Sequence, residues 1–229
     1  MGEAFRIGFD LDGVLADLGS AMSAIGRRLA GPAAALPAAA SEAVGEAGDG
    51  AGAEAALTRE IWRDIRDTEN FWETLAEIEP GSVMRLAALA EEHLWETLFL
   101  TQRPPTRGDT TQRQCQRWLT RHGFACPSVC VVSGSRGRVA DVLGLTLVVD
   151  DRPENCVDVV NDSKATAVLI WRGGQHPVAR GARRLGIAVA DSVGDCLDRL
   201  AAGFISPGSR DGLAARLKRW IDPSTDQPE

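Results

Sequence analysis

The residues best suited to chemistry are Asp10 and Asp12, which follow the short apolar stretch that begins at Phe5. That stretch predicts a buried strand, and two side chains at a spacing of two point the same way along an extended backbone. Both carboxylates would then project from the carboxyl edge of a sheet, where open α/β folds bind their ligands. Their repulsion in a poorly solvated cleft would be offset by a cation that prefers oxygen ligands, such as Mg2+. The alternative is an ordinary turn in which both aspartates are solvated.

Further polar residues fall at the ends of expected elements later in the chain. Thr101 ends one apolar stretch, Asp150 and Asp151 end another, and residues 133–138 open an expected helix. Phosphoryl transfer needs a carboxylate nucleophile, carboxylates that hold a metal ion, donors to the phosphate oxygens, and a fixed cation. The chain carries all of these groups, so the sequence predicts a phosphoryl-transfer site.

The elements that would position these residues alternate between short β-branched strands and helices. This alternation predicts a Rossmann-like three-layer α/β fold, with a parallel sheet covered by helices on both faces. After the first strand, we expect strands at 95–100, 129–132, 146–149, 167–171 and 187–190, and helices up to about 29 and at 57–65, 82–92, 109–122, 136–143, 153–161, 178–185 and 192–200.

A long connection follows the two aspartates. Roughly 80 residues separate the first strand from the next one, which is far longer than an ordinary crossover. We therefore expect residues 1–18 and 80–205 to form a catalytic core and residues 19–79 to form a small helical cap. Within the cap, residues 31–56 are rich in Ala and Gly and predict a flexible or loosely helical segment.

The C-terminal part of the chain predicts a separate helix. Residues 206–229 have the composition of a linker, an amphipathic helix at 213–221 and a tail. This helix either docks on its own domain, which we favour, or contacts a second subunit, in which case an oligomer would form through it.

The motifs together resemble those of phosphatases of the haloacid dehalogenase (HAD) superfamily, over about residues 5–200. The first motif is Asp10-Leu11-Asp12-Gly13, and the later ones are Leu98-Phe99-Leu100-Thr101, a basic residue near 136, and Val148-Val149-Asp150-Asp151. The small helical cap, with Phe71-Trp72-Glu73-Thr74-Leu75 followed by Glu79-Pro80-Gly81, is similar to that of the 5'(3')-deoxyribonucleotidases. The resemblance implies a HAD fold, a Mg2+ cofactor and hydrolysis of a phosphate monoester.

The resemblance also implies a role for each motif residue. Asp10 would attack phosphorus and form an aspartyl-phosphate, and Asp12 would serve as acid and then base while its backbone carbonyl helps to bind the metal. Thr101 would bind the phosphate, and Asp150 and Asp151 would complete the Mg2+ shell. Where the superfamily usually has Lys, the candidate is Arg136, with Arg138 as the alternative.

Other residues could contribute to substrate binding. Trp62 and Trp72 of the cap could stack on a nucleobase, although a small cap also needs aromatic residues for its own core. Gln102 and Arg103 follow Thr101 directly, so Arg103 would reach an anionic group of the substrate or form an ordinary surface ion pair. The arginines at 113, 117 and 121 form a helical stripe, which is more often a solvated helix face than a nucleic-acid contact.

Composition limits the classes of partner. The formal net charge is -7, which argues against binding of polymeric nucleic acid or an anionic membrane. No apolar run is long enough to span a bilayer, and the first residues lack the pattern of a secretory signal, so we expect a cytoplasmic enzyme. The substrate would be a small phosphorylated metabolite, with a nucleoside monophosphate as the leading choice. The alternatives are a sugar phosphate, another metabolite, a nucleic-acid end, or a catalytically silent module that binds a phosphorylated ligand.

Overall fold

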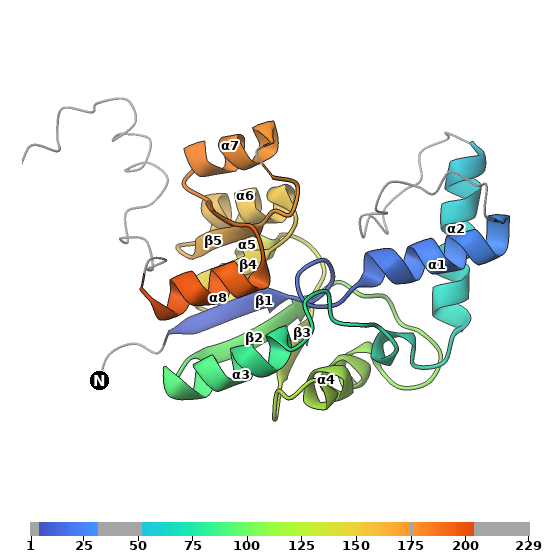
Figure 1. Ribbon diagram of the computed structural model, residues 1–229, viewed down its shortest axis with the longest axis horizontal. Helices are drawn as coiled ribbons and strands as arrows, with labels where there is room; N and C mark the ends of the chain where they lie inside the picture. The colour runs from blue at the N-terminus through green and yellow to red at the C-terminus, as the bar shows by residue number, and fades with distance from the viewer. Residues whose placement is uncertain (1–4, 32–51, 175, 204–229) are drawn as a thin grey trace, which may run out of the picture. The chain divides into compact units, whose positions relative to one another are not determined.

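The computed structural model describes residues 5–31, 52–174 and 176–203. Figure 1 shows how the elements follow one another along the chain. The strands are β1 (Arg6–Asp10), β2 (Glu96–Thr101), β3 (Ser128–Val131), β4 (Leu147–Asp150), β5 (Thr166–Ile170) and β6 (Ala188–Ala190). The helices are α1 (Leu18–Ala30), α2 (Ala53–Asp67), the 3-10 helix η1 (Phe71–Glu73), α3 (Ser82–Glu92), α4 (Thr111–Arg121), α5 (Arg136–Val142), α6 (Pro153–Asp162), α7 (Pro177–Arg184) and α8 (Val193–Ala201).

The strands form one sheet in the order β3-β2-β1-β4-β5-β6. The pairs β1–β4, β2–β3, β4–β5 and β5–β6 all run parallel. In the β1–β4 pair, Ile7 lies opposite Leu147 and Phe9 lies opposite Val149. The chain adds β2 and β3 on one side of β1 and β4 to β6 on the other, so the strand order reverses beside β1. In open α/β sheets such a reversal marks the edge at which ligands bind.

The structure confirms the expected α/β fold with a parallel sheet. Every strand and helix expected between Ser82 and Leu200 is present, with ends that differ by at most about two residues, the usual uncertainty of element boundaries. Helix α2 begins at Ala53, before the expected start at Leu57. Most of the segment expected to be flexible (32–51), and the linker, helix and tail expected at 206–229, lie outside the described residues.

The chain divides into two compact units. The first unit comprises the described residues of 5–9, 89–97 and 134–203. The second comprises the described residues of 10–88 together with 98–133. The division into a core (1–18 and 80–205) and a cap (19–79) stays a prediction.

In the first unit, helices pack on the strands β4, β5 and β6. Helix α6 packs on β4 and β5, α8 packs on β5 and β6, and α5 lies beside α6. The α5–α6 contact is close at Gly137, where an added Cβ atom would lie 2.0 Å from the backbone oxygen of Asp158. A side chain at position 137 would therefore push the two helices apart.

The second unit contains the helices that the sequence assigns to the cap. Helices α1 and α2 pack together, and Arg28 Nη2 of α1 lies 2.7 Å from Asp64 Oδ2 of α2. Ile61 and Ile65, one turn apart on α2, are buried, as the helical spacing predicts. Helix α4 packs against η1, and its buried Trp118 donates a hydrogen bond of 2.7 Å from Nε1 to the backbone oxygen of Leu75.

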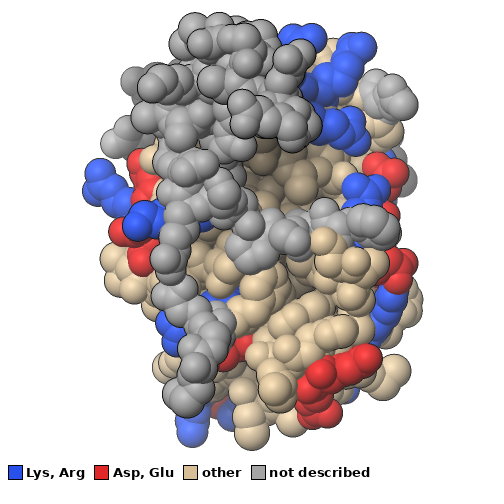
Figure 2. Space-filling view, turned by 90° about the vertical axis from the view of Figure 1, so that its left-hand side faces the viewer, with Lys and Arg blue, Asp and Glu red and all other residues tan. Residues whose placement is uncertain are grey.

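Among the described residues, no helix combines the length and apolar composition needed to cross a bilayer. On the face shown in Figure 2, side chains of both charge signs are visible, and several of opposite sign lie next to each other at the edges of the view.

Candidate active site

The loop that carries Asp12 is held in place by buried apolar side chains. Leu11, Val14 and Leu15 on this loop have no exposed surface. Its backbone is closed by hydrogen bonds from Leu15 N to Leu11 O (2.9 Å) and from Gly13 N to Ala16 O (3.1 Å). Gly13 has a φ of 81°, a left-handed conformation that side chains other than glycine rarely adopt. The loop therefore fixes where the Asp12 side chain starts.

A second segment of the same unit ties this loop down from outside. Asp17 N donates to Ala76 O, and Ile78 N donates to Leu15 O, each at 2.9 Å. The residues that the sequence places at the end of the cap therefore brace the loop of the first motif.

Asp12 forms a buried, two-point ion pair with Arg103. Arg103 Nε donates to Asp12 Oδ2 at 2.7 Å, and Arg103 Nη2 donates to Asp12 Oδ1 at 2.6 Å. Only 4% of the Asp12 side chain and none of the Arg103 side chain is exposed. The structure thus corrects the expectation of a surface ion pair at Arg103, and its guanidinium is engaged by the carboxylate of the first motif.

The rest of the Arg103 side chain is enclosed by the same unit. Its Nη1 donates to Cys115 Sγ at 3.2 Å, and its Cζ atom lies 4.8 Å from the ring centroid of Trp72. Burial alone lowers the pKa of Arg103, but the charge of Asp12 and the contact with Cys115 outweigh this effect and raise that pKa. For the neutral Cys115 thiol, burial has the opposite effect and raises the pKa. Arg103 is therefore a permanent cation, and Cys115 is a neutral partner.

Thr101 lies next to this pair and ends β2. The residue is 1% exposed, and its backbone oxygen accepts a hydrogen bond of 2.9 Å from Val132 N. Its Oγ1 accepts a hydrogen bond of 3.2 Å from the backbone N–H of Arg103. Because that contact uses only a lone pair of the hydroxyl, Thr101 keeps its own hydrogen to donate to another group.

Asp10 and Gln102 complete the predicted residues near these strand ends. Asp10 is the last residue of β1 and is 3% exposed. Gln102 is half-buried between Thr101 and Arg103. Asp10 and Asp12 are thus both buried carboxylates, which argues against the solvated turn considered above.

A second group of predicted residues lies in the first unit, around Asp150. Neither the Asp150 side chain nor the Arg136 side chain is exposed, and Arg136 Nε lies 3.3 Å from Asp150 Oδ2. Asn155 Nδ2 donates to Oδ1 at 3.1 Å and to Oδ2 at 2.9 Å, and the backbone N–H of Arg152 donates to Oδ1 at 2.9 Å. Burial raises the pKa of Asp150, and the charge of Arg136 opposes this shift.

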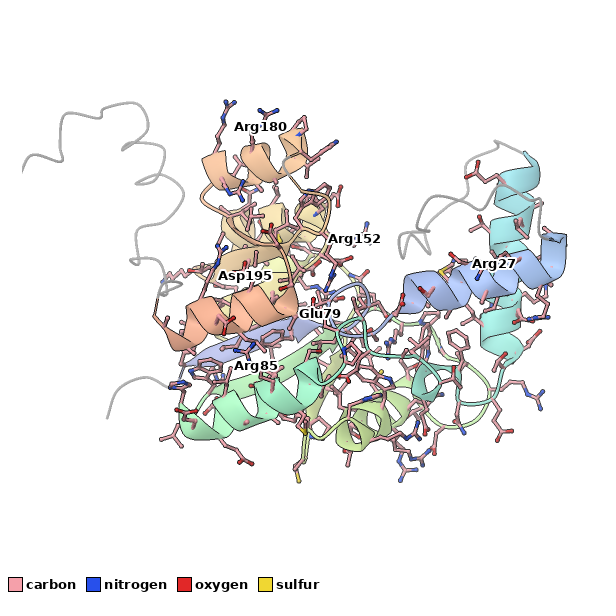
Figure 3. All side chains as sticks on the ribbon, in the orientation of Figure 1. Arg27, Glu79, Arg85, Arg152, Arg180 and Asp195 are labelled. Atoms are coloured by element: carbon pink, nitrogen blue, oxygen red, sulfur yellow. The ribbon has the colours of Figure 1, made fainter. Side chains whose placement is uncertain are left out.

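The start of α6 supplies most of these contacts. Arg152, labelled in Figure 3, precedes Pro153, the first residue of α6, and Asn155 lies in the first turn. Asn155 was not among the predicted site residues. A polar residue in the first turn of a helix is common, so only its position shortly after the aspartate pair could have suggested this role.

The two candidates for the basic residue of the third motif, Arg136 and Arg138, have different surroundings. Arg136 is the first residue of α5 and pairs with Asp150, whereas Arg138 is exposed. Ser135 caps this helix by accepting a hydrogen bond from Arg138 N, and its hydroxyl donates to Asp162 Oδ2 at 2.8 Å. These contacts fix the start of α5 and therefore the position of the Arg136 backbone.

The donor set can be compared with what Mg2+ requires. Asp10, Asp12, Asp150 and Asp151 offer carboxylate and carbonyl oxygens, which are the ligands that this hard cation prefers. Asp151 is half-buried after the end of β4. Among the described residues, no group of three or more His, Cys, Asp or Glu side chains is assembled to hold a metal ion. The donor types fit Mg2+, and its binding is therefore a proposal that rests on their chemistry.

The aromatic residues expected to touch the substrate are interior residues. Trp72 has no exposed surface, and Trp62 is 8% exposed. Trp72 Nε1 donates to Pro104 O at 3.0 Å, and its ring covers the Arg103 guanidinium. These contacts favour the role in the unit's own core over stacking on a base.

The arginine stripe of α4 is neutralised by acidic neighbours. Arg117 Nη1 lies 3.0 Å from Glu73 Oε1 and also pairs with Asp109, which in turn pairs with Arg113. Arg121 Nη2 lies 3.2 Å from Glu73 Oε2. The stripe therefore ties α4 to η1, which favours the solvated-face interpretation over a nucleic-acid contact.

The fold is similar to that of a HAD family hydrolase from Deinococcus radiodurans R1, solved with bound phosphate and sodium. The two share 18% sequence identity at a TM-score of 0.57, over 90% of this chain and 99% of that chain. This likeness shows that the chain has the fold of a HAD hydrolase. Two further structures with lower scores are a dehalogenase with an intermediate complex (TM-score 0.47, 13% identity, 88% of this chain and 99% of that one) and a putative beta-phosphoglucomutase from Thermotoga maritima (0.48, 16%, 86% and 98%). No protein-family model and no curated protein matches the sequence.

Proposed function

We propose that the chain is a HAD-superfamily phosphatase, a Mg2+-dependent hydrolase of phosphate monoesters. The observation that carries this proposal is the burial of both Asp10 and Asp12 at one strand end, at 3% and 6% exposed. Burying two neighbouring carboxylates opposes folding, so their presence is best explained by chemistry. The sheet order adds support, because β1 and β4 are neighbours and end in Asp10 and Asp150.

The proposed reaction uses the two aspartates in unlike roles. A carboxylate oxygen of Asp10 attacks phosphorus, the bond to the leaving oxygen breaks, and the leaving oxygen takes a proton from Asp12. Asp12 then removes a proton from water, which attacks the aspartyl-phosphate and releases phosphate and free Asp10. Thr101 donates its hydroxyl hydrogen to a phosphate oxygen, and Arg136 contributes a fixed positive charge.

The proposed metal site comprises the carboxylate of Asp10, the backbone carbonyl of Asp12, and Asp150 and Asp151. A bound Mg2+ would neutralise charge on the phosphate and on the clustered carboxylates. The contacts of Asn155 and of the Arg152 N–H would orient Asp150 toward this task, as outer hydrogen-bond donors do for metal ligands.

The proposed substrate is a small phosphorylated metabolite, and a nucleoside monophosphate is the first choice. This choice rests on the similarity of the short helical cap to the deoxyribonucleotidases. Because Trp62 and Trp72 are buried, recognition of a base would depend on other residues of the cap.

The test measures phosphate release by the purified chain from nucleoside monophosphates, sugar phosphates, a 3'-phosphorylated oligonucleotide and 4-nitrophenyl phosphate, with Mg2+ and with EDTA. We expect hydrolysis that requires Mg2+ and that falls by at least about 10³-fold in Asp10→Asn, because the nucleophile is lost. Equal rates for wild type and Asp10→Asn would overturn the mechanism. Binding of esters without turnover would indicate the silent binding module instead, and slow, equal turnover of all esters would exclude the nucleotidase assignment.

A further inference from the structure

We propose that Arg103 is the positioning residue for Asp12, holding its carboxylate in the orientation that serves proton transfer to the leaving group. This inference rests on the proposed function and adds a residue to it. Arg103 was considered above as an anion-binding or surface residue, but its side chain has no exposed surface.

The geometry of the pair restricts Asp12 in a way that a single contact would not. Two N–H groups of one planar guanidinium meet the two oxygens of one carboxylate, at 2.7 and 2.6 Å. A fork of this kind fixes the plane of the carboxylate as well as its distance, whereas the ammonium of lysine acts as a point charge. Rotation of the Asp12 side chain would break both hydrogen bonds together.

The pairing leaves Asp12 able to exchange a proton. An ionised carboxylate has about four lone-pair positions, and Arg103 occupies one on each oxygen. The remaining positions can hold the proton that passes to the leaving oxygen, and can later accept one from water. Positioning and proton transfer by the same carboxylate are therefore compatible.

Arg103 is itself held from several sides. Its Nη1 contacts Cys115 Sγ at 3.2 Å, and its backbone N–H binds Thr101 Oγ1 at 3.2 Å. The Trp72 ring covers its guanidinium at 4.8 Å, which is within the range of a cation–π interaction. Arg103 thus links Asp12 to the hydroxyl of Thr101.

The Trp72 ring is fixed in turn. Its Nε1 donates to Pro104 O at 3.0 Å, and its backbone N–H donates to Gln114 Oε1 at 3.2 Å. The 3-10 helix η1, which carries Trp72, therefore acts on Asp12 through the ring of Trp72 and the guanidinium of Arg103.

If the Asp12–Arg103 ion pair only stabilised the fold, its loss would affect the hydrolysis of different esters in another way than if it positioned Asp12. Proton donation by Asp12 matters for an alkyl phosphate, whose leaving alkoxide is strongly basic, and matters little for 2,4-dinitrophenyl phosphate, whose leaving phenolate needs no proton. Hydrolysis of the aspartyl-phosphate, in which Asp12 acts as base, is common to both esters and does not enter kcat/KM once formation of the aspartyl-phosphate is irreversible. Loss of positioning should therefore lower kcat/KM only for the alkyl ester. General loss of structure should slow both esters alike.

The experiment compares kcat/KM for 2,4-dinitrophenyl phosphate and a simple alkyl phosphate in wild type, Arg103→Lys and Asp12→Asn, with Mg2+. We expect Arg103→Lys to lower kcat/KM for the alkyl ester by about 10²-fold and for the dinitrophenyl ester by less than about 10-fold, a weaker form of the Asp12→Asn pattern. The matched control Arg121→Lys, on the exposed side of α4, should change neither rate. An equal loss on both esters in Arg103→Lys would overturn the positioning role while leaving the proposed function intact.

A second variant keeps the inference testable if Arg103→Lys does not fold. Trp72→Phe retains an aromatic face over Arg103 but loses the hydrogen bond to Pro104. We expect kcat/KM for the alkyl ester to fall by about 3- to 10-fold, a smaller loss than in Arg103→Lys, and kcat/KM for the dinitrophenyl ester to change less. A loss of equal size on both esters would contradict the inference. Failure of wild type to hydrolyse either ester would instead overturn the proposed function and this inference with it.

Discussion

Two buried aspartate–arginine pairs occur in the part of the chain that the structure describes, and they are built differently. Asp12 is held by the arginine itself, through two hydrogen bonds of 2.7 and 2.6 Å. Asp150 lies beside Arg136, whose Nε is 3.3 Å from its Oδ2, and it accepts shorter hydrogen bonds from Asn155 and from the Arg152 backbone. The charges are the same, but the first carboxylate is oriented by its cation and the second by the start of a helix.

The difference matches the two tasks that we propose. A proton donor has to face one atom of the substrate, so a rigid two-point contact suits it. A metal ligand has to remain ionised and available. The N–H donors of Asn155 and Arg152 orient the Asp150 carboxylate, and the charge of Arg136 favours its ionised form. Burial raises the pKa of Asp150, and a bound cation would favour its ionised form again.

The largest expected effect comes from replacing each arginine in turn, and it distinguishes the two pairs by the stability that each loses. Arg103→Met leaves the Asp12 carboxylate buried without its two donors, so we expect the free energy of unfolding to fall by about 3–5 kcal/mol. Arg136→Met should cost less, because Asn155 and the Arg152 N–H still bind Asp150. Urea unfolding at pH 7 measures both, with the exposed Arg138→Met as control. An equal or larger loss for Arg136→Met would remove the distinction.

A smaller effect tests the donors of the second pair. Asn155→Ala removes the side-chain amide that donates to both oxygens of Asp150, so we expect a loss of about 1.5–3 kcal/mol, typical of hydrogen bonds to a charged group. If Asp150 is a metal ligand, the same variant should bind Mg2+ about 10- to 100-fold more weakly by isothermal titration. The control is Asn161→Ala, on the exposed side of α6. Unchanged stability and unchanged affinity in Asn155→Ala would contradict this account.

A pH scan tests the raised pKa of Asp150. A carboxyl whose pKa is higher in the folded state than in the unfolded chain contributes stability below the unfolded pKa of about 3.9, and that contribution is lost as pH rises through the folded pKa. Relative to wild type, Asp150→Asn should therefore gain stability with rising pH, by at most about 1.4 kcal/mol per pH unit. Unfolding free energies measured between about pH 4 and 8 without metal provide the comparison. A difference that stays flat or falls with pH would exclude a raised pKa.

The sequence was sufficient to predict the helices and strands from Ser82 to Leu200 and the aspartates at the strand ends. Alternating apolar runs and helical spacing are local patterns, so the helix Ser82–Glu92 and the aspartates at the ends of β1 and β4 could be found from them. The helical spacing of Arg117 and Arg121 likewise predicted their shared face. It could not predict that Glu73 pairs with both, because that contact depends on the packing of α4 against η1.

Local sequence patterns could not predict which side chains contact one another within the candidate site. Arg103 and Asp12 are 91 residues apart in the sequence, and nothing near either one indicates the other. Asn155 could not be told from an ordinary polar residue in a first helical turn. The expected stacking role of Trp72 shows the same limit, because aromatic composition does not reveal which ring faces are covered.

The smallest expected effect contrasts the buried arginine with an exposed one. The hydrogen bond from Arg117 lowers the pKa of Asp109 by more than desolvation raises it, and a smaller effect of the hydrogen bond from Arg113 lowers it further. A lowered pKa contributes stability above the unfolded pKa, and that contribution is lost as pH falls through the folded pKa. Arg117→Ala should therefore lower stability slightly at pH 7, and this loss should shrink at acid pH.

Salt distinguishes the two arginines most directly. Charges exposed to solvent are screened within about 3 Å in 1 M salt, whereas a buried pair is screened much less. The loss in Arg117→Ala should therefore shrink between about 0.05 and 1 M NaCl, and the loss in Arg103→Met should persist. Urea unfolding at both salt concentrations measures this difference. If salt removed the Arg103→Met loss as well, water and ions would reach the Asp12–Arg103 pair, and its rigid positioning of Asp12 would be untenable.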